Sequence, residues 1–494
     1  MLACLSDAGC RALVVVLVGM DVDVREQSWW WESGVDARER VLERIEGPPP
    51  EIEKVDAVVI GGGLTGVSTA YGVLCIDPSA RVVIVEAGEI GCGASSRNGG
   101  HLWPSFEPNL GQSLESVDVE EAREELQDAF DYDFAGILDV AAFAERHGVG
   151  EEIQLALHGV AVDVVPSPGD YADMCKDPLP LLEALAAHSE AGKRMGSRIE
   201  GRERGGDVLG TSRVASLFGD GSPGFGGCMC EPGCGRIHPM RLVYAILEAA
   251  LDAVGEGGAL WVAEGVMATG REEVEGGGVR VTTDEGRVYD GAACVVAVNG
   301  YNLVPQLLPE WLRGEDVLDV PHELALSVQT SREPSLVSML RSEVVGDIVD
   351  GPDVPLLFAF PGDVYGRMDG RTLVVGSSVD FYVKDEVPDE VAEELVSIAR
   401  AVVEPDAALE LPASGWTGRL AYTSDMRPLV GPVGESTYVA GGYNGNGVTK
   451  GLRSGYAAAA FVCGGGGGEV PEFMRVVVPK AFDPRRFEPS SPVA

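Results

Sequence analysis

The sequence predicts an α/β protein in which a parallel sheet is interlocked with a second, α+β domain. A short apolar run, residues 58–60, is typical of a parallel strand buried on both faces. A second apolar run, residues 82–85, ends in the acid Glu86. The turn between the two runs has three glycines in a G-x-G-x-x-G pattern at the opening of a predicted helix: Gly61, Gly63 and Gly66. Strand, glycine turn, helix and acid together predict a Rossmann-like dinucleotide-binding unit and disfavour a coincidental glycine turn.

Each part of this unit has a chemical task. The first glycine permits the tight turn, the second lets a pyrophosphate approach the backbone, and the third lets the helix pack on the strand. The unpaired N–H groups at the start of the helix then attract the phosphate charge. Glu86, 20 residues beyond Gly66, can accept hydrogen bonds from an adenosine ribose. The cofactor contacts predicted here are Gly61, Gly62, Gly63, Leu64, Thr65, Gly66, Glu86 and Ala87.

A second loop of small residues follows the acid, and its composition suits a chain that runs close beneath a large flat ring. Residues 91–101 read GCGASSRNGGH. This loop resembles the D-amino-acid-oxidase-like family of FAD-dependent amine oxidoreductases, and within it the γ-glutamylputrescine oxidase-like subgroup, whose loop reads GATGRNGGH or GASGRNGGH. The glycine fingerprint alone does not separate FAD from NAD, whereas the resemblance implies FAD, expected to be bound non-covalently. It adds six cofactor contacts, of which Ser96 departs from the family pattern: Ser95, Ser96, Arg97, Asn98, Gly99 and Gly100.

The resemblance recurs far along the chain, in the family's order, and covers about residues 27–480. The matching segments are QSWWW (27–31), GRIHPMRL (235–242), CVVAVNGY (294–301), WTG (416–418), TSDMRPLVGP (423–432) and GGYNGNG (441–447). In relatives the last glycine loop opens a long helix whose dipole stabilises negative charge on the flavin. Asn446 stands where relatives often have histidine. The contacts implied by these segments and by the end of a predicted strand are Val266, Asn299, Gly300, Gly418, Gly442, Tyr443, Asn444, Gly445, Asn446, Gly447, Val448 and Thr449.

The remaining elements follow from hydrophobic periodicity and from turn residues. Residues 1–52 are an arm that ends in three prolines, a stiff linker into the first strand. The five glycines 464–468 are expected to form a surface loop. Helices are predicted at residues 120–147, 178–191 and 238–254. Strands are predicted at 158–165, 259–266, 279–283, 288–298, 325–330, 356–360 and 372–375.

A chain of 494 residues is too long for one ordinary core, so two domains are expected. The prediction is a Rossmann-like FAD-binding domain interlocked with a helical and antiparallel-sheet substrate domain. The FAD-binding domain comprises residues 53–110, 205–304 and 411–465. The substrate domain comprises residues 111–204 and 305–410, and residues 466–494 are a C-terminal tail.

Four residues are candidates for the catalytic side of the site: His101, Tyr365, Arg367 and Trp416. Tyr365 is expected to cap a polar group. Arg367 is expected to bind a substrate carboxylate as a bidentate pair, although a surface arginine in a hairpin fits its spacing equally well. His101 either lies near the flavin ring or is a packed, hydrogen-bonded residue. Trp416 is expected to line the pocket or the flavin, with a core tryptophan as the alternative. Gly376 is followed by Ser377 where relatives usually have paired glycines.

The reaction implied by the resemblance is oxidation of a C–N bond in an amino acid, an N-methyl amino acid or a polyamine-type amine. A hydride moves to the flavin and water hydrolyses the resulting imine, so no catalytic dyad is required. The reacting amine must be neutral, and a site that disfavours the ammonium form helps.

Two alternatives stay open at this stage, a flavin dehydrogenase with an acceptor other than oxygen and a non-catalytic FAD-binding protein. No lysine occurs between Lys193 and Lys384, whereas several oxidases of the family place one near the flavin to promote the reaction with oxygen. A pyridine-nucleotide enzyme would need a second G-x-G-x-x-G after a strand, and the sequence has none.

Composition excludes several partners. The formal net charge of −41 argues against binding to nucleic acid or to anionic membrane surfaces, which would repel such a protein. The partners that the resemblance implies are a small amine and oxygen or another electron acceptor. The apolar segment 12–20 is too short to span a bilayer and lacks a cleavage site. A cytoplasmic protein is expected, with a signal-peptide core as the alternative.

The cysteines indicate neither a disulfide framework nor a metal site. Ten cysteines in a chain of this length are few, and their spacing is irregular. Cys228, Cys230, Cys234 and His238 lie close together in sequence, but their spacing fits no common zinc pattern. No metal is predicted.

Overall fold

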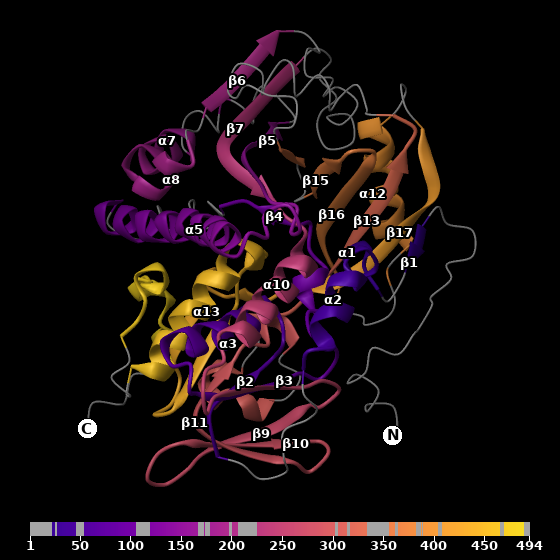
Figure 1. Cartoon of the computed structure of the whole chain (residues 1–494). Helices are drawn as coiled ribbons and strands as arrows, with labels where there is room; N and C mark the ends of the chain where they lie inside the picture. The colour runs from indigo at the N-terminus through magenta and orange to yellow at the C-terminus, as the bar shows by residue number, and fades with distance from the viewer. Residues whose placement is uncertain are drawn as a thin grey trace.

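The computed structural model contains two large sheets with helices between and around them (Figure 1). Three features discussed above lie outside its described residues, namely segment 12–20, the proline run 48–50 and glycines 465–468. The structure describes residues 22–24, 27–45, 54–104, 119–165, 172, 178–196, 200–205, 225–301, 305–313, 317–332, 355–360, 364–381, 387, 389–403, 408–464 and 469–488.

The first sheet is an eight-stranded sheet in the order β19-β20-β11-β2-β3-β8, with β10 on β11 and β9 on β10. Strands β20, β11, β2, β3 and β8 are parallel, and helix α3 is the crossover between β2 and β3. The predicted Rossmann-like unit is therefore confirmed. The bounds are β2 Lys54–Ile60, β3 Arg81–Val85, β8 Ala259–Ala263, β9 Ala268–Glu273, β10 Val279–Thr283, β11 Val288–Val296, β19 Leu429–Pro432 and β20 Thr437–Gly441.

Three helices pack together beside this sheet: α3 Leu64–Ile76, α10 Pro239–Asp252 and α13 Gly447–Cys463 (Figure 1). The contact between α3 and α13 is close because small residues line it. A Cβ on Gly455 would lie 2.4 Å from the Cβ of Ser68, and one on Gly72 would lie 2.6 Å from the Cβ of Ala459. This close crossing brings the first turns of α3 and α13 side by side, where the two predicted cofactor loops begin.

The second sheet has ten strands, in the order β1-β17-β13-β16-β15-β14-β5-β7-β4 with β6 on β7. The pairs β1–β17 and β14–β5 are parallel and the others are antiparallel. The bounds are β1 Val22–Val24, β4 His101–Leu102, β5 Ala156–Val165, β6 Glu200–Gly205, β7 Phe225–Arg236, β13 His322–Thr330, β14 Leu356–Phe360, β15 Val364–Asp369, β16 Thr372–Phe381 and β17 Leu409–Arg419.

The other elements cover these sheets or connect them. Helix α5, Val119–His147, lies against α13, while α1 and α2 lie against α10 (Figure 1). The remaining bounds are α1 Trp29–Ser33, α2 Val35–Leu42, α7 Pro178–His188, α8 Glu190–Arg194, α12 Asp389–Val403, β12 Leu318–Asp319 and β18 Tyr422–Thr423. The 3-10 turns are Ala94–Ser96, Asn299–Tyr301, Pro305–Leu307, Glu310–Leu312, Glu472–Met474, Lys480–Phe482 and Pro484–Phe487.

Several predicted elements have different limits in the structure. The predicted helix 178–191 is two helices, because Ser189 ends the first and its Oγ caps the second by accepting from the Gly192 N–H at 2.8 Å. The predicted strand 259–266 ends at Ala263, since the chain turns at Gly265 with φ +69°. Strands β5, β13 and β16 extend beyond their predicted ranges, whereas β11 stops two residues short of its predicted end.

Three strands lie in a different sheet from the one expected. Strands β4, β7 and β17 belong to the ten-stranded sheet, although the sequence places residues 53–110, 205–304 and 411–465 in the FAD-binding domain. The reason is that a motif beside the cofactor loops, such as WTG, indicates proximity to the site but does not identify the sheet that supplies it. The chain rejoins the parallel sheet only at β19.

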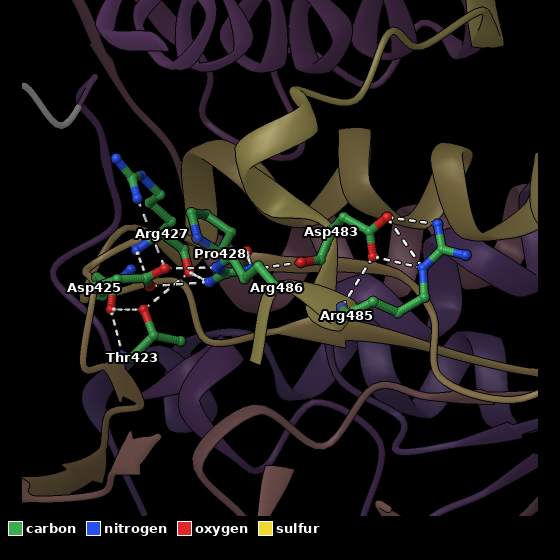
Figure 2. Close-up of polar contacts among 8 residues, drawn as sticks. Thr423, Asp425, Arg427, Pro428, Asp483, Arg485 and Arg486 are labelled. Atoms are coloured by element: carbon green, nitrogen blue, oxygen red, sulfur yellow. Dashed lines mark hydrogen bonds and ion pairs between the residues drawn. The ribbon is translucent and has the colours of Figure 1, made fainter. Parts of the chain in front are cut away.

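The C-terminal segment is fastened to the loop that precedes β19 (Figure 2). The Arg486 Nη2 donates to Asp425 Oδ1 at 3.0 Å and to the Arg427 carbonyl at 2.7 Å, and its Nη1 donates to the Pro428 carbonyl at 3.2 Å. A charged group with several acceptors makes stronger contacts than a neutral pair. The TSDMRP motif is thus held by a residue close to the end of the described chain.

Candidate functional site

The glycine turn between β2 and α3 leaves no room for side chains. Gly61 has φ +104°, and a Cβ there would lie 2.6 Å from the Ala297 carbonyl oxygen. A Cβ on Gly66 would lie 1.8 Å from the carbonyl oxygen of Gly61. Helix α3 is preceded by Gly63, which has no side chain to cap it. An uncapped helix start behind a tight glycine turn is a site that fits a pyrophosphate.

Glu86 lies at the carboxyl end of β3, beside the same turn. Its Oε2 accepts from the Gly62 N–H at 2.6 Å and its Oε1 from the Gly88 N–H at 2.8 Å. Burial raises the pKa of the Glu86 carboxyl, and the two N–H donors act in the opposite direction. Ala87 follows it, and the Val266 N–H donates to the Glu86 carbonyl at 3.0 Å. The acid and the end of β8 are therefore adjacent, as the proposed ribose and adenine contacts require.

The loop between β3 and β4 is organised by its own polar side chains. Asn98 Nδ2 donates to the carbonyls of Ala94 and Ser95 at 2.9 and 3.0 Å, and its Oδ1 accepts from the Gly100 N–H at 2.8 Å. Ser95 Oγ accepts from the Leu64 N–H at 2.8 Å, which ties the loop to the first turn of α3. Arg97 Nη1 donates to the Thr417 carbonyl at 2.9 Å. Arg97 and Asn98 thus shape the loop through its backbone.

The last glycine loop of the sequence, residues 441–447, lies beside the glycine turn that precedes α3 and is called the closing glycine loop. Asn299, at φ +45°, accepts from the Gly442 N–H through its Oδ1 at 2.9 Å. The Tyr443 hydroxyl lies 2.9 Å from Thr65 Oγ1 in α3, and burial raises the pKa of Tyr443 to about 12. Asn444 Oδ1 accepts from the Thr423 N–H at 2.8 Å. These contacts hold the loop against both the parallel sheet and the segment that follows β17.

Helix α13 begins at this loop, with Asn446 at its N-cap and no side-chain hydrogen bond capping it. Its first turn contains Val448 and Thr449, and the Thr449 hydroxyl donates to the Trp103 carbonyl at 2.9 Å. Gly445 has φ +85°, a conformation that favours glycine. The structure therefore brings a second uncapped helix start close to the first one. This arrangement suits an anionic or electron-rich group between the two loops.

Two further glycines allow strands to pass close to the loops. A Cβ on Gly300 would lie 2.3 Å from the Leu420 carbonyl oxygen, and one on Gly418 would lie 3.2 Å from the Arg97 carbonyl oxygen. Gly418 is in β17, which places this edge of the ten-stranded sheet directly on the loop between β3 and β4. Residues 91–100 of that loop carry predicted flavin contacts and are called the flavin loop below.

Arg367 is buried, at 1% exposure, so the interpretation of it as a surface arginine in a hairpin is wrong. Its role as the residue that binds a substrate carboxylate stays a prediction. Its Nη1 donates to the carbonyls of Gly100 and Ile237 at 2.6 and 3.2 Å, and its guanidinium lies 4.6 Å from the ring centroid of Trp30. Arg367 thus stabilises the flavin loop through the Gly100 carbonyl.

Trp416 is also fully buried, at 0% exposure, as the core interpretation requires. That it lines the pocket or the flavin stays a prediction. Its Nε1 donates to the Arg97 carbonyl at 3.1 Å. Four neighbouring strands place four residues side by side in one row across the sheet. The row runs from Trp416 in β17 through Ala325 in β13 and Gly376 in β16 to Tyr365 in β15. Directly paired residues share a face of a sheet, so this face of the ten-stranded sheet packs on the flavin loop.

Tyr365 occupies the position expected of a residue that faces the flavin loop. A Cβ on Gly376 would lie 2.3 Å from its hydroxyl oxygen, and one on Gly99 would lie 2.9 Å from its Cε2. Gly376 thus provides the close approach expected at this position. The His101 ring meets the Tyr365 ring edge-on at a centroid distance of 5.4 Å. Burial, and secondarily the negative charge of Glu323, raise the pKa of Tyr365, which keeps its hydroxyl protonated.

Glu323 is a functional candidate that the sequence analysis missed. It lies two residues before Ala325, on the same face of β13, opposite Gly418. Its side chain is 6% exposed, and its Oε1 accepts from the Tyr422 hydroxyl at 3.1 Å. The Tyr422 hydroxyl in turn lies 3.7 Å from the position of a Cβ on Gly445. A carboxylate therefore lies between the flavin loop and the closing glycine loop. The signal was an acid within an apolar strand, HELALSV.

A buried ion pair, also missed, joins α13 to α5. The Lys450 Nζ lies 2.9 Å from Asp133 Oδ2, and the two side chains are 5% and 2% exposed. Lys450 is in the first turns of α13, close to the start of the helix at the closing glycine loop. The stretch without lysine between residues 193 and 384 does not bear on Lys450, which lies in the helix that follows the last glycine loop.

The cysteine and histidine cluster has other roles where it is described. His238 Nδ1 accepts from the Arg241 N–H at 3.3 Å as the N-cap of α10, and its Nε2 lies 3.0 Å from Ser33 Oγ. Cys234 is buried in β7, and the side chains of Cys228 and Cys230 lie outside the described residues. Within the described part of the chain, no three His, Cys, Asp or Glu side chains are grouped as metal ligands.

His101 gives a first testable prediction, on pH. Burial, and secondarily the positive charge of Arg367, lower the pKa of His101 to about 3. Because its ordinary value is about 6.5, the unfolded chain binds the proton more readily, and stability falls as pH falls from 6.5 toward 3. Between pH 7 and pH 5, the wild type is expected to lose free energy of unfolding that the variant His101→Gln does not lose. The two losses should differ by up to about 2 kcal/mol. Urea unfolding at both pH values measures this difference, and parallel decreases would contradict it.

Among the helices in the described ranges, none combines the length and the apolar content needed to cross a membrane.

A sequence model of the DAO family, described as FAD dependent oxidoreductase, matches residues 56–461.

Two curated proteins are similar over most of their length. The probable oxidoreductase OrdL of Rhizobium meliloti (strain 1021) is 26% identical over 405 residues, 81% of each chain. The gamma-glutamylputrescine oxidoreductase of Escherichia coli (strain K12) is 26% identical over 395 residues, 80% of each chain. Among solved structures, the L-proline dehydrogenase of P. horikoshii superposes with a TM-score of 0.60 at 16% identity, covering 88% of this chain and 98% of that one. The last similarity establishes the shared fold.

Proposed function

The chain belongs to the DAO family of FAD-dependent oxidoreductases, and from this premise we propose that it oxidises the C–N bond of an amino acid, an N-methyl amino acid or a polyamine-type amine. The protein is an FAD-dependent oxidoreductase, and FAD is its cofactor. When bound, FAD accepts the hydride from the carbon next to the nitrogen. Non-covalent attachment and a cytoplasmic location stay predictions from the sequence, as does the absence of a nucleic-acid partner.

The observation that carries the proposal is the face of the ten-stranded sheet that packs on the flavin loop. It presents the phenol of Tyr365 and the carboxylate of Glu323, with His101 beside them. His101 is neutral at ordinary pH, because its pKa is lowered to about 3. The group therefore adds no positive charge next to a reacting amine. A polar but water-poor wall of this kind suits orientation of a neutral amine.

Within the proposed set, the charges favour a polyamine-type amine. Arg367, the expected carboxylate-binding residue, is directed at backbone carbonyls, whereas Glu323 has the opposite charge. Since the reacting nitrogen must be neutral, we assign to Glu323 a second, protonated nitrogen of the substrate. The similarity to a protein named gamma-glutamylputrescine oxidoreductase supports the same choice.

A dehydrogenase that uses an acceptor other than oxygen is the second candidate. Lys450, the buried lysine on the flavin-facing helix, forms an ion pair with Asp133. The other lysines in the described ranges, Lys54, Lys193 and Lys480, are exposed. This observation favours an enzyme that reacts slowly with oxygen. Rapid reoxidation of the reduced flavin by dissolved oxygen would exclude this candidate in favour of an oxidase.

The test compares matched substrates on two variants. Glu323→Gln is expected to lower kcat/KM for a diamine such as putrescine by about 10–100-fold, since one charge-assisted contact is worth about 1.5–3 kcal/mol. The same variant is expected to change kcat/KM for butylamine much less, because butylamine lacks the second nitrogen. Aldehyde formation measures both. Glu410→Gln, an exposed acid on β17 of the same sheet, is the matched control and should leave both substrates unchanged.

Equal losses with both amines would exclude Glu323 as the group that recognises the second nitrogen. Turnover confined to α-amino acids would exclude the polyamine choice while keeping C–N oxidation. No product from any amine or amino acid, with FAD bound, would favour the non-catalytic alternative.

A further inference from the structure

Four neighbouring peptide groups of the flavin loop accept hydrogen bonds from side chains distant in sequence. The donors are Ser28 Oγ to the Ser96 carbonyl, Trp416 Nε1 to the Arg97 carbonyl at 3.1 Å, Trp30 Nε1 to the Asn98 carbonyl at 2.6 Å and Arg367 Nη1 to the Gly100 carbonyl at 2.6 Å. Two of these donors come from the ten-stranded sheet. The other two come from the arm that precedes the parallel sheet. We call these four donors the carbonyl clamp.

The arm residues of the clamp lie outside the residues that the family model matches. The family match begins at residue 56, whereas Ser28 and Trp30 belong to α1 and its N-cap. Two buried side chains from this arm nevertheless contact the loop that carries the proposed flavin contacts. The arm therefore contributes to the cofactor site although the family match does not include it.

The arm is held firmly enough to act as a support. Ser28 Oγ also accepts from the Trp31 N–H at 3.1 Å, so one hydroxyl both caps α1 and reaches the loop. Arg241 of α10 donates to the Ser33 carbonyl at 3.0 Å and to Asp36 at 2.8 Å, which anchors the arm to the flavin-binding domain.

Trp30 occupies the centre of the clamp. The Arg367 guanidinium lies 4.6 Å from its ring centroid, and the His238 ring meets it edge-on at 5.2 Å. A Cβ on Gly100, whose φ is +68°, would lie 3.1 Å from Trp30 Cζ2 and 2.7 Å from Arg367 Nη1. The close packing of the clamp thus accounts for the glycine at this position.

The clamp has a consequence for the direction of the loop amides. A peptide unit is planar, so fixing its carbonyl on one side directs its N–H to the opposite side. We propose that Ser28 and Trp30 are positioning residues for FAD, which fix the peptide planes of residues 96–98 and so set the affinity and the environment of the bound flavin. This role concerns cofactor binding and does not depend on which substrate is oxidised.

Trp30→Phe tests the proposal most directly, because it keeps an aromatic ring against Arg367 and removes only the indole N–H. The Asn98 carbonyl then loses its buried donor, a loss expected to raise the FAD dissociation constant about 10-fold. The visible circular dichroism of the bound flavin is expected to change as well. The dissociation constant is measured by FAD titration of the full-length apoprotein. The circular dichroism is measured on the full-length holoprotein. Ser28→Ala is expected to act in the same direction.

Trp29→Phe is the matched control. Trp29 is the neighbouring, half-buried tryptophan, and its ring contacts Trp30 at a centroid distance of 4.5 Å. This variant should keep the wild-type dissociation constant and flavin spectrum. Wild-type values in both Trp30→Phe and Ser28→Ala would overturn the proposal. Equal weakening by Trp29→Phe and Trp30→Phe would overturn it too, because general loosening of the arm would then explain the effect. If Trp30→Phe fails to fold, Ser28→Ala decides the question.

Discussion

Replacement of Gly66 by alanine is expected to abolish FAD binding. The new Cβ would lie 1.8 Å from the carbonyl oxygen of Gly61, a backbone atom that cannot move aside as a side chain does. Helix α3 would have to withdraw from β2, and the uncapped helix start would leave the position next to the pyrophosphate. We expect the FAD dissociation constant to rise at least 100-fold, equivalent to about 3 kcal/mol. The flavin content of the purified variant and an FAD titration measure this effect.

The matched control for this prediction is Gly150→Ala. A Cβ on Gly150 would meet no atom within 4 Å, and its backbone conformation is accessible to alanine. This variant should bind FAD as the wild type does. A Gly66→Ala protein that carries a full complement of FAD would show that the turn between β2 and α3 is not the pyrophosphate site.

Loss of Asp133 is expected to cause the largest change in stability. Asp133→Asn leaves the Lys450 ammonium buried without its counter-charge, and breaking a buried pair in this way costs about 3–5 kcal/mol. Lys450 is in the first turns of α13, so the start of the flavin-facing helix should loosen with it. Urea unfolding should show a lower midpoint, and FAD should be released at lower urea concentration than in the wild type.

A double variant distinguishes the cost of the unpaired buried charge from a general loss of packing. Asp133→Leu combined with Lys450→Met removes both charges, so it should be more stable than either single variant. Glu190→Gln, which breaks the exposed Lys193–Glu190 pair, is the control and should leave the midpoint unchanged. A double variant less stable than both single variants would contradict the assignment of the cost to the unpaired charge.

The Rossmann-like unit is predictable because its signals are local. Gly61, Gly66 and Glu86 all act through the backbone of a strand, a turn and a helix that are adjacent in sequence. The flavin loop is predictable for the same reason, since Asn98 and Ser95 bond within the loop or to the nearby helix.

The residues around these loops depend on contacts between distant segments, and there the sequence is less informative. Spacing alone does not tell a substrate-binding arginine from one directed at carbonyls, and only the fold shows that Arg367 and Trp416 donate to backbone carbonyls. Glu323 acquires its position only because β13 pairs with β17. Lys450 and Asp133 meet only because α5 packs on α13. The membership of β7 and β17 in the second sheet likewise follows from pairing that no single segment encodes.

The central claim is that FAD bound at these loops oxidises a C–N bond in a small amine or amino acid. Anaerobic titration of the purified protein with diamines, monoamines, amino acids and N-methyl amino acids, followed by the visible flavin absorption, tests it most directly. The account predicts that one class, with diamines first, bleaches the flavin band to completion. A flavin band that persists unchanged with every compound in the panel would contradict the claim.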